Sequence, residues 1–145
     1  MQRTRANTLK RLQRLGPQRQ GLLVRAALAL SAASGAVALL PFDRAIRLGS
    51  VPLGRGRNQL RADDCVWAVE AVAWRLPWRT MCIEKGLAVQ RLLRRAGTHA
   101  RLHYGARHHP QTGKLEAHVW VTVGDKIVIG GNEAAGFAEV GAFPA

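Results

Sequence analysis

The stretch TMCIEKGLAVQRLLRRAG, residues 80–97, decides the fold. Its apolar residues, Ile83 and Leu87 among them, recur at the spacing of a helix that buries one face. Gly97 is the expected left-handed stop after the last turn, where arginines suit the helix dipole. The sequence therefore predicts an amphipathic helix over residues 82–96, with Cys82 in its first turn.

Downstream of this helix the apolar period changes to two, which predicts strands at residues 99–107, 115–123 and 126–129. Gly-Asp at residues 124–125 is typical of a tight hairpin connection. Upstream, a helix is expected over residues 62–76, where Ala-Asp-Asp supplies an N-cap and favourable charge near the dipole. Helices thus precede an antiparallel sheet. The predicted fold class is α+β, with N-terminal helices packed on a small antiparallel sheet.

The charge balance limits the function classes. The chain has 145 residues, enough for one domain, and 22 Lys and Arg against nine acids give a net charge of +13. Two cysteines exclude a disulfide-rich scaffold. Residues 111–145 carry two cations and four acids, a net charge of −2, which is unusual for a nucleic-acid binder. We expect no nucleic-acid partner. A basic nucleic-acid-binding or membrane-surface-binding protein remains the alternative.

The chain divides into three parts by composition. We expect residues 1–20 to be a basic and flexible arm, residues 21–60 a helical segment and linker, and residues 61–145 the core. Residues 21–40 are apolar and Ala-rich after a basic flank, a pattern that fits a buried core helix, a membrane anchor or a signal. Small polar residues interrupt the run, which favours the core helix. We expect a cytoplasmic protein, with peripheral membrane association through this segment as the alternative.

Cys82 is the candidate nucleophile. Thr80 or Met81 begins its helix, with Thr80 as the expected cap. Free backbone N–H groups and the dipole at a helix start stabilise a thiolate and can hold an oxyanion during acyl transfer. The alternative is a small buried side chain, the usual role of a free cysteine. Cys65 lies in mid-helix, and its loss is expected to leave function intact.

His118 is the candidate general base. It lies in a predicted strand and shares a face with Trp120 and Thr122, whereas the opposite face carries only valines. The valine face is the better core face, so His118 points to the side where a cleft can lie. The alternative is a core histidine bonded to a backbone carbonyl.

A third group should orient the imidazole. A two-residue hairpin loop places Gly131 opposite His118, and a three-residue loop places Asn132 there. Asp125 sits at the hairpin tip, roughly 20 Å along the strand, and is a poor partner. Asn132 is the favoured third member, and Glu133 is the second choice.

The motifs LPWRTMCI (residues 76–83), LLRRAG (92–97) and EAHVWV (116–121) together resemble the transglutaminase-like leader peptidases of lasso-peptide biosynthesis, the B-type maturation proteins. The resemblance covers about residues 40–143 and implies a papain- or transglutaminase-like core. It also implies that Cys82 is the nucleophile and His118 the base. The family usually has an Asp shortly after the His strand, where this chain reads IGGNE. The third role therefore stays open between Asn132, Glu133 and Asp125.

This resemblance implies a cysteine peptidase that removes the leader from a ribosomally made precursor peptide. A separate ATP-using lasso cyclase would then join the freed amine to an Asp or Glu side chain. Because residues 1–60 show no strand pattern of a leader-recognition domain, we expect a separate leader-recognition protein as partner. No cofactor and no metal are expected. The rival zinc site lacks a known Cys/His spacing and would use His99, His103, His108 and His109.

Overall fold

The computed structural model describes residues 10–11, 13–56 and 60–144. The predictions made for the other residues of the N-terminal arm and of the linker lie outside this part of the chain. Residues 17–20, which the sequence assigned to the arm, form the first turn of a long helix.

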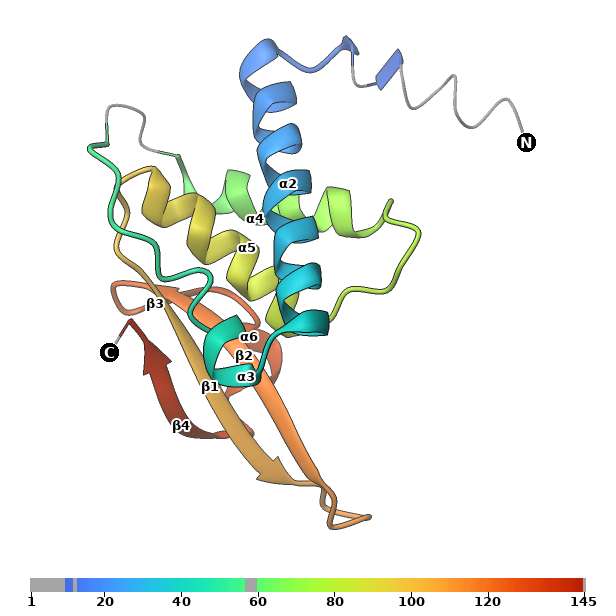
Figure 1. Cartoon of the computed structure of the whole chain (residues 1–145), viewed down its shortest axis with the longest axis vertical. Coiled ribbons are helices and arrows are strands. Elements are labelled where there is room, and N and C mark those ends of the chain that lie inside the picture. The colour runs from blue at the N-terminus through green and yellow to red at the C-terminus, as the bar shows by residue number, and fades with distance from the viewer. Residues whose placement is uncertain (1–9, 12, 57–59, 145) are drawn as a thin grey trace.

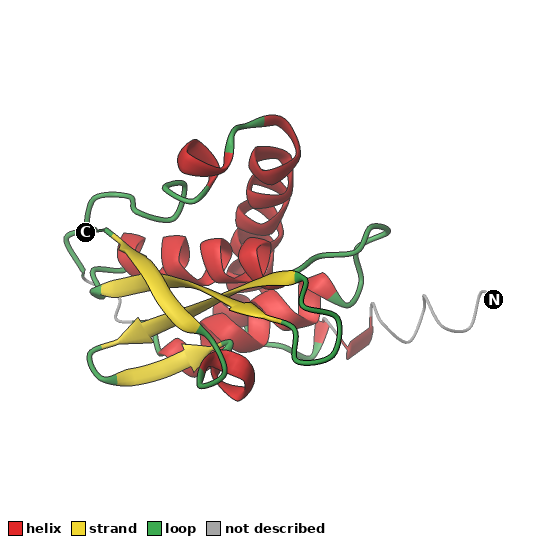
Figure 2. Ribbon diagram, turned by 90° about the horizontal axis from the view of Figure 1, so that it is seen from below, coloured by secondary structure: helices red, strands yellow, loops and turns green. Residues whose placement is uncertain are grey.

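Helices occupy the first two thirds of the chain, and a four-stranded sheet occupies most of the rest. The sheet is antiparallel with strand order β3-β2-β1-β4. Figure 1 shows the helices gathered at one end of the sheet, and Figure 2 shows the strong twist of the strands. The α+β prediction is confirmed. The elements are α2 (Pro17–Leu39), α3 (Phe42–Ala45), α4 (Ala62–Ala73), α5 (Cys82–Arg95), β1 (Ala100–His108), β2 (Leu115–Val123), β3 (Lys126–Ile129), α6 (Gly131–Ala134) and β4 (Ala138–Phe143).

Both predicted helix caps are wrong. Met81, not Thr80, is the N-cap of α5, and its backbone N–H donates to the carboxylate of Glu84 three residues later. Arg61 occupies the N-cap position of α4. The two aspartates that the sequence proposed as caps lie inside the first turn of α4, where their charge still suits the dipole. Side chains beyond the immediate cap position therefore supply these helix starts with negative charge.

The valine face of β2 packs on α5, as predicted. A Cβ added at Gly86 of α5 would lie 3.1 Å from Val119 Cγ1, so the helix and the sheet approach closely. This close packing fixes the distance between the first turn of α5 and strand β2. Buried side chains from both layers form the core, including Leu87, Leu93, Leu102, Val119 and Val121.

Helix α2 is part of the same core. Its buried face includes Leu22, Ala26 and Leu30, and it packs on both α4 and α5. The indole of Trp78, in the segment before α5, donates to Ser34 Oγ at 3.1 Å and ties that segment to α2. By length and composition α2 could also cross a membrane, but a third of its most apolar window is buried in the fold. A soluble core helix and a signal sequence satisfy the same criterion.

Candidate active site

Cys82 is the first residue of α5. Glu84, whose side chain is buried, accepts the N–H of Met81 and so fixes the start of the helix at this position. The first N–H groups of a helix have no partner within it, and they point out of the end that carries the cysteine. The half-buried thiol of Cys82 therefore lies beside donors that can bind developing negative charge.

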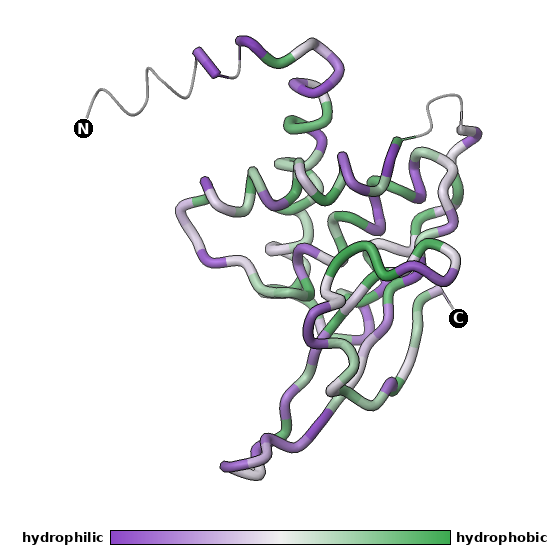
Figure 3. Tube along the Cα trace, turned by 180° about the vertical axis from the view of Figure 1, so that it is seen from behind, coloured by the Kyte–Doolittle hydropathy of each residue, from purple (hydrophilic) through white to green (hydrophobic). Residues whose placement is uncertain are grey.

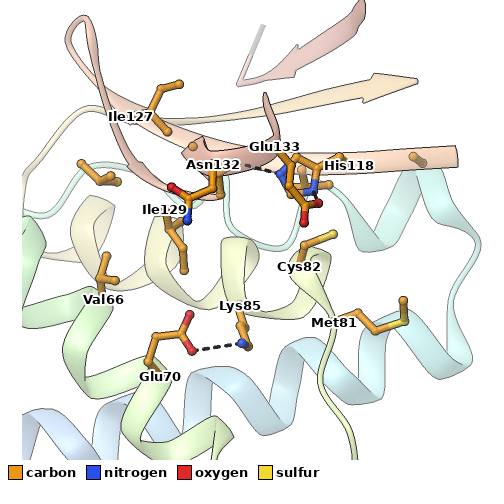
Figure 4. A pocket seen from close by; sticks show the side chains of 15 residues that line it. Val66, Glu70, Met81, Cys82, Lys85, His118, Ile127, Ile129, Asn132 and Glu133 are labelled. Carbon is orange, nitrogen blue, oxygen red and sulfur yellow. Dashed lines mark hydrogen bonds and ion pairs between the residues drawn. The ribbon is translucent and has the colours of Figure 1, made fainter. Parts of the chain in front are cut away.

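Cys82 opens into a cavity of about 800 Å³ between the helices and the β2–β3 hairpin. Figure 4 shows Cys82, His118 and Glu133 together at one end of it, with the ion pair of Glu70 and Lys85 on the floor, 3.0 Å apart. The structure thus brings the predicted nucleophile and the predicted base into one cavity. The lining also includes Val66, Met81, Ile127, Ile129 and Asn132.

The ring of His118 is held in one tautomer. Its Nε2 lies 2.8 Å from the carbonyl oxygen of Gly130. Because a carbonyl oxygen can only accept, Nε2 carries a proton, and in the neutral ring the lone pair is on Nδ1. The ring is buried and lies against the aromatic rings of Trp120 and Phe137, with centroid distances of 6.2 and 5.2 Å. Both its hydrogen bond and its packing therefore fix the orientation of the His118 ring.

A bulge in the β2–β3 ladder places the Gly130 carbonyl. The register shifts between Thr122, which pairs with Ile127, and Val121, which pairs with Ile129. Gly130 follows with φ +81°, and a Cβ there would lie 2.6 Å from the carbonyl oxygen of Val119. Both the left-handed backbone and the close approach require glycine.

The third-member candidates lie at different distances from the ring. Glu133 Oε2 is 3.8 Å from Nδ1 of His118, but the Glu133 side chain is 69% exposed. Asn132 lines the same cavity, yet the expectation that it lies on an extended β3 is wrong, because β3 ends at Ile129 and Asn132 lies in α6. Asp125 lines a different pocket, formed with residues of β1. The catalytic roles given to these side chains stay predictions.

The main-chain partner of His118 was missed by sequence reasoning, which looked for a side chain. The signal that could have found it is the Gly130–Gly131 pair directly after a short strand. A glycine there permits a left-handed turn that directs a carbonyl back toward the neighbouring strand.

We expect Asn132→Ala to change the cleavage rate by less than about threefold, because Gly130 already holds Nε2. Glu133→Gln should lower the rate by no more than about tenfold, because an exposed carboxylate is screened by water and salt. Steady-state rates at low and high salt check both. A loss of a hundredfold or more in Asn132→Ala would assign the orienting role to Asn132 instead.

Cys65 is the internal control for the nucleophile. It is fully buried, and burial raises the pKa of its thiol from 9.0 to about 11. Because the folded-state pKa is the higher one, this thiol supports folding fully below pH 9, and its contribution is lost as the pH rises toward 11. We expect iodoacetamide to modify Cys65 only on unfolding and Cys65→Ala to retain cleavage within about twofold. Native-state labelling read by peptide mapping checks this, and rapid labelling of Cys65 at neutral pH would contradict it.

Three of the four histidines proposed for a zinc site, His103, His108 and His109, have other hydrogen-bond partners. His103 lies between Thr122 Oγ1 at 2.8 Å and Glu139 Oε2 at 3.1 Å, and His108 Nδ1 lies 3.1 Å from the Gly113 carbonyl. Among the residues that the structure describes, no three His, Cys, Asp or Glu side chains converge as a metal site would require.

Comparison with known proteins agrees with the fold. A family model described as the transglutaminase-like superfamily matches residues 22–141, from α2 through most of β4. Neither the curated proteins nor the solved structures gave a match. The family match covers most of the chain and includes both Cys82 and His118. The chain therefore belongs to the transglutaminase-like superfamily.

Proposed function

We propose that this protein is a cysteine peptidase that removes the leader from a ribosomally made lasso-peptide precursor. The observation that carries the peptidase assignment is a cysteine at a helix start and a tautomer-fixed histidine in one cavity. The superfamily includes cysteine peptidases, which supports this assignment. The lasso-peptide substrate rests on the sequence motifs around Cys82 and His118.

The chemistry follows from the protonation of His118. Nδ1 accepts the thiol proton of Cys82, and the thiolate attacks the carbonyl carbon at the leader–core junction. N–H groups at the start of α5 bind the oxyanion. The imidazolium then protonates the leaving amine as the C–N bond breaks, which leaves a thioester on Cys82. Water, deprotonated at Nδ1, attacks the thioester, and the C–S bond breaks to release the leader carboxylate and the thiol.

The carboxylate of Glu133 stabilises His118 in only one state of the catalytic cycle, the one in which the ring is charged. Once His118 is an imidazolium, Glu133 Oε2 at 3.8 Å places a negative charge beside Nδ1. The exposure of Glu133 keeps this contribution small. The Gly130 carbonyl accepts from Nε2 in both the neutral and the charged ring, so it holds the ring in place throughout.

Two partners belong to this proposal. A separate leader-recognition protein would deliver the precursor, and a lasso cyclase would use the α-amine that cleavage frees. Both partner assignments rest on the resemblance of the motifs around Cys82 and His118 to the leader peptidases of lasso-peptide biosynthesis.

The experiment is cleavage of a candidate precursor peptide in heavy-oxygen water, with and without the recognition protein, read by mass spectrometry. We expect a leader fragment that carries one heavy oxygen at its new carboxylate and an unlabelled core peptide, because water resolves the thioester. An intact precursor in the presence of the partner would contradict the lasso assignment. Cleavage that persists in Cys82→Ala would contradict the peptidase assignment.

A further inference from the structure

A second hollow lies on a different face of α4 from the catalytic cavity. It has a volume of about 580 Å³ and lies between α2 and α4. We call it the α2–α4 groove. Its walls are mainly apolar and its rim is cationic. The residues that line it are Arg11, Leu15, Leu23, Trp67, Ala71, Val72, Arg75 and Leu76.

Helix α4 separates the groove from the active site. Val66 and Glu70, four residues apart, line the catalytic cavity, whereas Trp67 and Ala71, one position further along, line the groove. A segment held against α4 in the groove would therefore lie within about one helix diameter, 10–12 Å, of the catalytic cavity. About four extended residues cross that distance. One peptide can thus occupy both sites.

The positive charge at the rim of the groove favours an occupant with negative charge. Two arginines and no acid appear among the described residues that line it. Arg19, which pairs with Asp64 at 4.0 Å, lies over the Trp67 ring at 5.1 Å. The guanidinium of Arg75 is fixed at the rim by its hydrogen bond to the Ala71 carbonyl, 2.8 Å long. An occupant needs apolar side chains for the walls and carboxylates for the rim. Residues 1–9 of this chain contain two arginines and no acid, so their charge is wrong for the groove.

The size of the groove favours a peptide over a folded protein. A volume near 580 Å³ accommodates a few side chains, as small-molecule and peptide sites do. A stable interface with a folded partner buries about 800 Å² on each side, much more than a groove of this kind offers.

We propose that the α2–α4 groove is an exosite that binds an acidic, apolar segment of the peptide substrate remote from the scissile bond. The exosite holds the substrate while the attached scissile bond enters the catalytic cavity, which raises its effective concentration there. The purpose of the exosite rests on the proposed peptidase function, but binding to it does not.

The test measures binding directly by fluorescence anisotropy. The probe is a fluorescein-labelled peptide of about a dozen residues in which leucines alternate with glutamates, and its counterpart has lysines in place of the glutamates. We expect the acidic peptide to bind wild-type protein at least about tenfold more tightly than the basic one, with affinity that falls as salt rises. Equal binding of the two peptides would overturn the proposal.

Variants locate the site. Arg75→Glu and Trp67→Ala should each weaken binding of the acidic peptide by at least about fivefold. Lys114→Glu makes the same charge change as Arg75→Glu in the turn between β1 and β2, where Figure 3 shows a hydrophilic tip far from the helices, and should change affinity by less than about twofold. Equal weakening by Lys114→Glu would indicate a general charge effect and overturn the proposal.

Two further measurements distinguish a failure of the exosite proposal from a failure of the peptidase proposal and from unfolding of a variant. Cys82→Ala should bind the acidic peptide as tightly as wild type, so a failure of the peptidase proposal leaves the binding result intact. Melting temperatures show whether each variant folds. If Arg75→Glu is unfolded, Arg75→Gln and Lys114→Gln, which each remove one positive charge, take the place of the first pair. Weaker binding in Arg75→Gln alone supports the proposal, and equal weakening in both overturns it.

Discussion

Replacing Cys82 with alanine should abolish peptide-bond cleavage and leave the fold intact. Among the described residues that line the cavity, no other side chain carries a thiol or hydroxyl, so we expect the rate to fall by at least about 10³-fold. His118→Ala should lower it by about 10²–10⁴-fold, because it removes the general base and the acid for the leaving amine. Cleavage rates measured by mass spectrometry check both variants.

The double variant gives a sharper reading of the same prediction. Residues that act as one catalytic unit are strongly non-additive, so Cys82→Ala combined with His118→Ala should be about as slow as Cys82→Ala alone. Losses that multiply would mean that the two side chains act independently. Cys65→Ala is the matched control for the loss of a thiol, since Cys65 is buried in the core and outside the cavity.

Gly130→Ala should lower both stability and cleavage, by more than any other variant outside the pair of Cys82 and His118. A non-glycine residue at φ +81° costs about 1–2 kcal/mol, and the added Cβ would lie 2.6 Å from the Val119 carbonyl oxygen. Something must shift, and the Gly130 carbonyl that orients His118 shifts with it. We expect a clear loss of thermal stability and a fall in cleavage of at least about tenfold at temperatures where the variant is folded.

Gly124→Ala is the matched control for this prediction. Gly124 lies in the loop of the same hairpin with φ +58°, but a Cβ there meets nothing within 4 Å. This variant therefore incurs only the backbone strain, worth roughly 4 °C in melting temperature per kcal/mol, and should cleave at the wild-type rate. Equal rates for Gly130→Ala and Gly124→Ala would remove the Gly130 carbonyl from the mechanism.

The sequence predicted those features that local pattern determines. Strict alternation in β2 placed its valines toward the core, and the two-residue turn at Gly124-Asp125 gave the correct bounds of β2 and β3. The amphipathic pattern of α5 placed Cys82 at the start of that helix. These features follow from side-chain periodicity and turn chemistry, which can be recognised in a single sequence.

Features that depend on tertiary contacts could not be predicted from the sequence. The bulge next to Val121 changes the register, and neither α6 nor β4 was foreseen. The sequences of α6 and β4 are short and weakly patterned. The packing of α6 on β2 and the pairing of β4 with β1 are therefore set by the tertiary fold and not by intrinsic propensity. The partner of His118 was missed for a related reason, because a backbone carbonyl has no residue type to search for.

The central claim is that the thiol of Cys82 and the imidazole of His118 work as a pair, and alkylation kinetics test it most directly. Wild type and His118→Ala are treated with iodoacetamide under native conditions at neutral pH, and peptide mapping follows Cys82 with buried Cys65 as the internal reference. We predict that Cys82 reacts at least about tenfold more slowly in His118→Ala, because the base that accepts its proton is gone. Equal rates of Cys82 modification in the two proteins would contradict the account.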